Sequence, residues 1–170
     1  MQAASRLLCR SHLREGLSMI EWVIVFHVLA GAAWFGGHIF MEGMMAAAGR
    51  TKEPSTILTV NLGIVDTSAR LFTVAGILVL VTGIWIVVDL PQYGFEMMFI
   101  SIGFLVVLIG LGVGIFYFRP KGAELKALVA KEGPTSTAAL AKAKQLAMVS
   151  HVMTLLVTIA LVVMVVKPGV

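Results

Sequence analysis

The stretch FHVLAGAAWFGGHIFMEGMM (residues 26–45) places two histidines and a glutamate inside an otherwise apolar run. His27 and His38 are eleven residues apart, which is about three turns of α-helix, so they share one helix face with Glu42. Because an α-helix rises 1.5 Å per residue, the two histidines lie ~16 Å apart along the axis. They therefore mark two candidate sites at different depths.

The inner candidate site forms around His38, because His151 lies at the same depth on the last apolar stretch. The two histidines face each other if the first and last helices are neighbours. Glu42 is one turn nearer the same end, and Asp66 and Arg70, spaced i,i+4 on the second helix, reach that end as well. Several methionines surround this level: Met41, Met44, Met45, Met148 and Met153. This inner cluster is the strongest constellation in the sequence.

Two cofactor chemistries suit the inner cluster. Two histidines on facing helices are suited to axial ligation of haem b iron, with Arg70 available to a propionate. A copper ion or another transition metal is the alternative, because thioethers favour Cu(I). The candidate metal ligands are His38, His151, Glu42, Met41 and Met148.

Proton transfer through His38, Glu42 and Asp66 is a third chemistry, and it is the common use of intramembrane ionisable residues in transporters. The simpler alternative is structural. A histidine inside a membrane also hydrogen-bonds neighbouring helices, in contacts worth ~0.6–2 kcal/mol. Methionines serve equally well as flexible packing residues.

The outer candidate site contains His27, with Thr82, Trp85, Asp89, Glu96 and Met97 at comparable depth. No second histidine lies there, so bis-histidine haem ligation within one chain is excluded at this level. His–Met ligation of a cofactor and a site shared between two copies stay open. His27 is therefore a candidate cofactor-binding residue beside His38, His151 and Arg70.

The elements that carry these residues are predicted to cross a membrane. Hydrophobic residues make up 59% of the 170-residue chain and charged residues 13%, with a mean hydropathy of +0.97. Four stretches, about 20–44, 71–88, 96–118 and 146–166, approach or exceed the ~20 apolar residues that a helix needs to cross a bilayer. We predict an all-α integral membrane protein, a four-transmembrane-helix antiparallel bundle of residues 19–170.

The basic residues predict the orientation of this bundle. Six of them lie in the loop 119–145 and three flank the first loop, nine in all, against Lys167 and three N-terminal arginines at the other side. The positive-inside rule then places the loop 119–145 in the cytoplasm and both termini in the periplasm. The net charge of +4 matches anionic lipid and requires no nucleic acid. Residues 1–18 are expected to be an interfacial helix, or translation begins at Met19.

Pairs of small residues predict close helix packing: Gly110 with Gly114, Ala33 with Gly37, and Gly76 with Gly83. Such pairs serve contacts within the bundle, within a homo-oligomer or with subunits of a larger membrane complex. The sequence has no GxSxG, HExxH, Walker A or CxxC motif, so no enzymatic activity is predicted.

Three stretches resemble a known family: FHVLAGAAWFGG, ARLFTVAGILVLVTGIWIV and LVVMVVKP. They are similar to bacterial predicted integral membrane proteins of unknown function, which resemble the membrane domain of the copper-resistance protein CopD and, more distantly, HemJ-type protoporphyrinogen oxidases. The resemblance spans nearly all of residues 19–168 and implies a four-helix bundle in the bacterial inner membrane. It singles out His27, which forms an H-x-x-x-x-x-x-W pattern with Trp34. It implies haem b at a first-helix histidine, or copper uptake.

Together, these observations predict a four-helix inner-membrane protein that binds haem b or a copper ion through intramembrane histidines. The alternatives are a non-catalytic accessory subunit of a larger membrane complex, and a small transporter or proton-handling protein.

Overall fold

The protein is built almost entirely from long helices. The structure, a computed structural model, describes residues 18–168 except the side chains of Asp66 and Ala69, so the predictions for residues 1–17 lie outside the described residues. The helices in this part of the chain are α2 (Met19–Thr51), α3 (Pro54–Asp89), α4 (Met98–Val113), the π-helical turn η1 (Gly114–Phe118), α5 (Arg119–Glu132) and α6 (Thr137–Val166). Because α4, η1 and α5 run on without a break, they give one long rod, Met98–Glu132.

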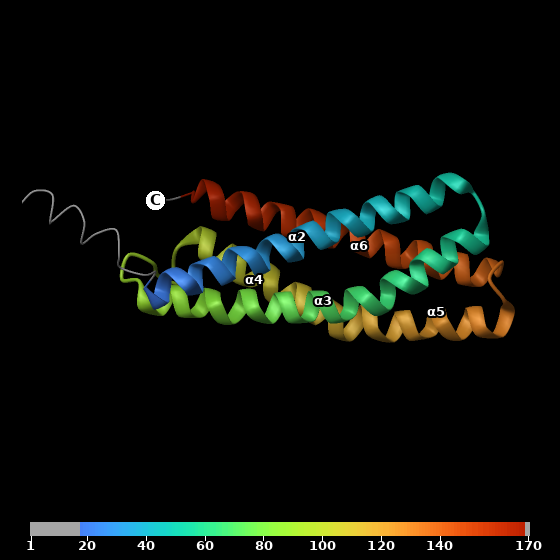
Figure 1. Cartoon of the computed structure of the whole chain (residues 1–170), viewed down its shortest axis with the longest axis horizontal. Coiled ribbons are helices and arrows are strands. Elements are labelled where there is room, and N and C mark those ends of the chain that lie inside the picture. Colours follow the sequence, from blue (N-terminus) through green and yellow to red (C-terminus); the bar gives the residue numbers. More distant parts are fainter. Residues whose placement is uncertain (1–17, 169–170) are drawn as a thin grey trace, which may run out of the picture.

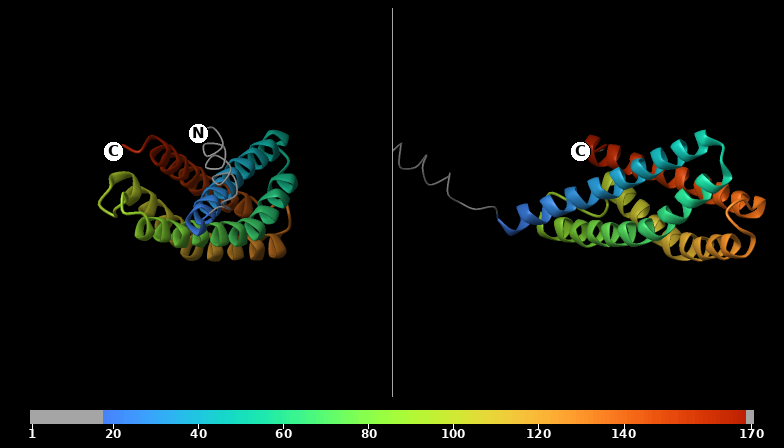
Figure 2. Two further views of the ribbon diagram at one scale, coloured as in Figure 1. Left: turned by 60° about the vertical axis from the view of Figure 1, so that its left-hand side comes forward. Right: turned by 45° about the vertical axis from the view of Figure 1, so that its right-hand side comes forward.

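The four long helices run alternately in opposite directions (Figure 1). α2 packs against α3 and α6, and α4 packs against the same two helices, which gives a ring of four. Figure 2 shows the same order from two further sides. Each of the four is long and apolar enough to cross a membrane. The predicted four-helix antiparallel membrane bundle is confirmed.

Local sequence sets the two turns at one end of the bundle. Lys52 adopts a left-handed conformation (φ 58°) that ends α2, and Pro54 at the first turn then starts α3. Gly133, at φ 88°, ends α5, as a residue without a Cβ readily does. Ser136 then caps α6 by accepting a hydrogen bond from the backbone N–H of Ala139 at 3.1 Å.

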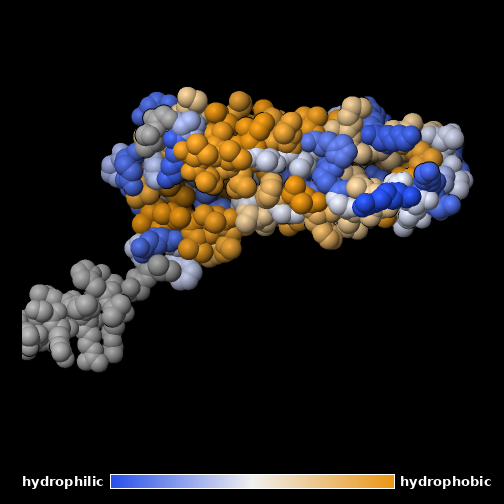
Figure 3. Space-filling model, turned by 90° about the horizontal axis from the view of Figure 1, so that it is seen from above, coloured by the Kyte–Doolittle hydropathy of each residue, from blue (hydrophilic) through white to orange (hydrophobic). Residues whose placement is uncertain are grey.

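The helices are longer than the predicted apolar stretches. α3 has 36 residues and is therefore about 54 Å long, against ~30 Å for a hydrocarbon core. The segment 119–145, expected as a loop with a short helix, is helical except at 133–136. The extra turns lie together at one end, here called the polar end: residues 46–51, 54–70, 119–132 and 137–145. Figure 3 shows apolar colouring concentrated on one half of the visible face and more hydrophilic colouring toward the polar end.

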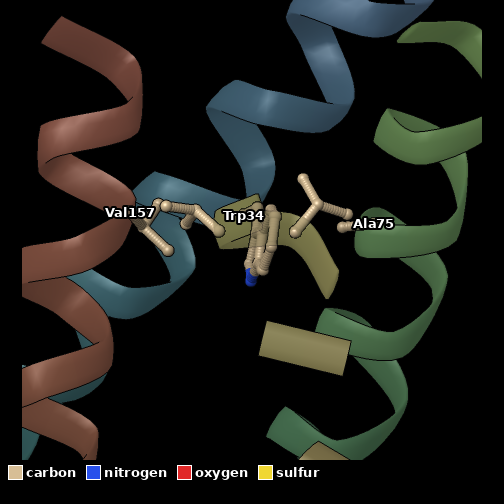
Figure 4. Packing of buried hydrophobic residues seen from close by; sticks show 5 residues of the cluster. Trp34, Ala75 and Val157 are labelled. Carbon is tan, nitrogen blue, oxygen red and sulfur yellow. The ribbon is translucent and has the colours of Figure 1, made fainter. Parts of the chain in front are cut away.

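Two clusters of buried side chains hold the bundle together. The membrane core contains Trp34, Ala75, Val106, Val107 and Val157, and Figure 4 shows the Trp34 ring between Val157 of α6 and Ala75 of α3. The polar-end core contains Leu58, Leu125, Ala139, Ala143 and Leu146. The polar end is therefore a packed extension of the bundle.

Glycines permit close packing at specific points in the apolar part. A Cβ on Gly110 would lie 2.7 Å from the Trp34 ring, and one on Gly76 would lie 2.9 Å from Leu111. Gly114, by contrast, has no neighbouring side chain within 4 Å of such a Cβ, and it begins η1. The predicted Gly110–Gly114 pair is thus two separate features, a helix contact and the start of a π-helical turn.

Candidate functional site

Glu42 of α2 is the centre of a polar cluster between α2 and α6. Its Oε1 accepts hydrogen bonds from Ser150 Oγ at 2.9 Å and from Thr154 Oγ1 at 3.1 Å. Its Oε2 is buried, makes no hydrogen bond of good geometry, and forms an ion-pair contact with Nδ1 of His151. A carboxylate in apolar surroundings is costly unless polar partners surround it, and these three side chains supply them.

His38 joins this cluster through Thr154. Its Nδ1 lies 3.3 Å from Thr154 Oγ1, and its ring stacks on Phe72 of α3 with the ring centroids 4.1 Å apart. Only 5% of His38 is exposed. The stacking fixes the ring plane, and the Thr154 contact fixes which edge faces α6.

The cluster forms a continuous polar chain from the surface to the interior. His151 is its exposed end, with 64% of its side chain accessible, whereas the Glu42 side chain is 16% accessible. The order of contacts is His151, Glu42, Thr154, His38. The chain therefore links the outer surface of α6 to a buried imidazole.

A cavity of about 70 Å³ adjoins the buried end of this chain, between α2, α3, α6 and the α4–η1 rod. Its polar lining includes His38, Asn61, Ser68, Thr73 and Ser150. Cavities that hold drug-sized ligands measure ~300–1,000 Å³. A haem at this level therefore requires the helices to move apart.

The structure gathers part of the predicted inner cluster. His38, Glu42 and His151 lie together, although Glu42 and Thr154 separate the two histidines. Met41 is buried and lines the cavity. The predicted ligand Met148 is 65% exposed on α6.

Two further predicted residues lie on α3. Arg70 is exposed on α3, and the side chain of Asp66 lies outside the described part of the structure. Among the described residues, no three His, Cys, Asp or Glu side chains are arranged to hold a metal ion. The haem and copper assignments therefore stay predictions.

His27 belongs to a second polar contact, on the other side of the membrane core. Its Nδ1 lies 2.9 Å from Thr82 Oγ1 of α3, and Thr82 Oγ1 lies 2.5 Å from the carbonyl oxygen of Leu78, to which it donates. Because the single hydroxyl proton is used there, the His27 ring N–H is the donor to Thr82, and Nε2 carries the lone pair. Gly83 leaves room for the ring, since a Cβ there would lie 3.2 Å from His27 Cε1.

Sequence reasoning missed the hydroxyl groups that connect the inner cluster. Ser150, Thr154 and Thr158 recur every four residues on α6, and such spacing places them on one helix face. This four-residue spacing could have predicted a hydroxyl-bearing face on α6. Asn61 was missed as well, although a buried amide in a membrane helix is as informative as a histidine.

The fold and the polar cluster together define a multi-pass, four-helix membrane protein. Comparisons with protein-family models, with curated proteins and with solved structures gave no significant match for this chain. The resemblance to the CopD-like and HemJ-like families accordingly remains a prediction from the three quoted stretches.

Proposed function

We propose that this membrane protein transfers protons through Glu42. The observation that carries the proposal is the position of the Glu42 carboxylate between apolar helices: Oε2 contacts His151, and Oε1 accepts hydrogen bonds from Ser150 and Thr154. Intramembrane carboxylates in this setting are typical of proton relays in transporters. A purely structural carboxylate does not need an exposed histidine on one oxygen and a buried histidine beyond the other.

The proposed route has three proton steps, and each follows a contact between two side chains. A protonated His151 gives its Nδ1 proton to Glu42 Oε2, which leaves a neutral imidazole and a neutral carboxyl group. The carboxyl group then rotates, and the Thr154 hydroxyl turns from Glu42 to His38. The proton passes to Thr154 Oγ1 while Thr154 donates its own hydroxyl proton to His38 Nδ1, which carries the lone pair in the Nε2–H tautomer. Glu42 is then a carboxylate again, Thr154 is unchanged, and His38 carries the charge.

The same proposal includes an orientation. The polar end and the adjoining turn at Lys52 carry nine lysines and arginines, whereas Lys167 is the one such residue at the opposite end of the described chain. The positive-inside rule places the polar end in the cytoplasm of a bacterial inner membrane, with both termini in the periplasm. A reporter fused after Lys131 is expected to be active only in its cytoplasmic form. Activity in the periplasmic form would reverse the orientation.

Proton flux into proteoliposomes tests the role of Glu42. With an imposed membrane potential and a pH-sensitive dye inside the vesicles, the wild-type protein is expected to carry protons. Glu42→Gln keeps the size of the side chain but removes the ionisable group, so we expect the flux to fall about tenfold or more. Thr154→Val, which breaks the link to His38, is expected to lower it as well.

The matched control is Glu96→Gln, which removes an exposed carboxylate outside the bundle. It is expected to leave the flux at the wild-type level. Equal flux in wild type and Glu42→Gln would contradict the proposal and favour an accessory or packing role for the cluster. A visible absorption band together with stoichiometric iron or copper in the purified protein would instead support the predicted cofactor, and its loss in His27→Ala or His38→Ala would locate it.

A further inference from the structure

The cavity beside His38 reaches from the polar end to the membrane core. Asn61 and Val65 line it at the polar end, Met45 lines it next to that end, and Thr73 lines it on the apolar part of α3. Trp34 also contributes to the wall, and its ring is packed so tightly against Gly110 that a Cβ there would lie 2.7 Å away. The cavity therefore extends along the bundle axis and ends at the membrane core.

Polar groups are distributed along this cavity rather than gathered at one point. Asn61 is 7% exposed, and within the described part of the chain its side chain makes one hydrogen bond, from Nδ2 to the carbonyl oxygen of Ile57 at 2.8 Å. Its Oδ1 and second N–H are thus available to the cavity. Ser68 lies about two turns further along α3, and Ser150 of α6 also lines the cavity. A buried water molecule needs 2–4 polar partners, and this wall supplies them at successive levels.

The volume also matches water. A site for one water needs roughly 10–15 Å³ of such volume, so a cavity of about 70 Å³ has room for about five molecules. We propose that the cavity is a water-filled pathway that connects the polar end of the bundle with His38. The purpose of this pathway rests on the proposed function, because the pathway supplies the aqueous end of the proton route. Its existence is tested without any measurement of proton flux.

Two adjacent residues of α3 provide the test. Thr73 lines the cavity, whereas Val74 is 59% exposed on the outer surface of the bundle, and their depths differ by about 1.5 Å. Each is replaced by cysteine in a Cys9→Ser background, which removes the single native cysteine. The variants in liposomes are then treated with a small, charged methanethiosulfonate. This reagent needs a thiolate, which forms in water and not in hydrocarbon.

We expect Thr73→Cys to react more than about tenfold faster than Val74→Cys, because water reaches the thiolate only through the cavity. Adding Ser68→Phe, which places a ring in the cavity wall, is expected to slow the reaction of Thr73→Cys to near the Val74→Cys rate. Size-exclusion chromatography and circular dichroism establish that each variant is folded. If Ser68→Phe does not fold, the Thr73 and Val74 pair still decides the result.

Equal rates for the two cysteines, whether slow or fast, would overturn the pathway. Fast labelling of Thr73→Cys combined with a Glu42-independent proton flux would retain the pathway and reject the proposed function. Slow labelling of Thr73→Cys combined with a Glu42-dependent flux would reject the pathway and retain the proposed function.

Discussion

Replacing Trp34 with alanine is expected to lower the free energy of unfolding by about 3 kcal/mol. Trp34 is 5% exposed and is the largest side chain of the membrane core. Truncation of a buried tryptophan costs ~3–5 kcal/mol, and the lower end applies here because lipid tails are as apolar as the core. The loss then comes mainly from missing packing contacts between α2, α3 and α6. Reversible unfolding in mixed micelles, followed by circular dichroism, measures it.

The contact between Trp34 and Gly110 gives this prediction an internal check. Gly110→Ala alone is expected to cost about 1–3 kcal/mol, because the new Cβ would lie 2.7 Å from the indole ring and the ring must shift. In the Trp34→Ala background the same change is expected to cost less than half as much, since the ring is gone. Trp22→Ala, at a site that is 49% exposed, is the control and is expected to change stability by less than about 0.5 kcal/mol. Additive effects at Trp34 and Gly110 would contradict the contact.

Replacing Leu125 with alanine is expected to destabilise the protein by about 2–5 kcal/mol, the range for buried leucines. Leu125 of α5 is fully buried (0% exposed) and packs in the polar-end core with Leu58 of α3. We place this core beyond the hydrocarbon, so the lost burial from water adds to the cavity that remains. The full destabilisation typical of a buried leucine is therefore expected, whereas the value for Trp34→Ala is at the lower end of its range.

Leu108→Ala is the matched control, because Leu108 is 56% exposed on the apolar surface of α4. It exchanges a lipid contact for another lipid contact and is expected to cost less than about 1 kcal/mol. Similar losses for Leu108→Ala and Leu125→Ala would mean that the polar end is not a packed core. The same unfolding measurement serves both variants.

The number and direction of the helices were predictable because each apolar stretch is long enough to cross a bilayer as a helix, which satisfies its own backbone hydrogen bonds there. The full lengths of the helices were not predictable from the sequence. The additional turns at residues 54–70 and 119–132 mix polar and apolar residues, and without a packing partner such segments also suit a surface loop. What makes them helical is the burial of Leu58 and Leu125 against α6, which is information that no single stretch contains.

The candidate site was predictable only in part for a similar reason. The helical period identified the shared face of His38 and Glu42, and depth counting identified His151. Neither reveals that Glu42 lies between the histidines, because this depends on how α2 and α6 are rotated about their axes. The role of Thr154 depends on the same rotation, and so does the exposure of Met148.

The two cores have a thermodynamic consequence. If the polar-end core excludes water while the membrane core only exchanges lipid for protein, unfolding of the polar end carries most of the heat-capacity change of the whole molecule. Urea and cooling act on that end first, because both weaken the hydrophobic effect. Detergent chain length mainly affects the stability of the membrane core. A single melting temperature therefore describes this bundle poorly, because the polar end is stabilised against water and the membrane core against lipid.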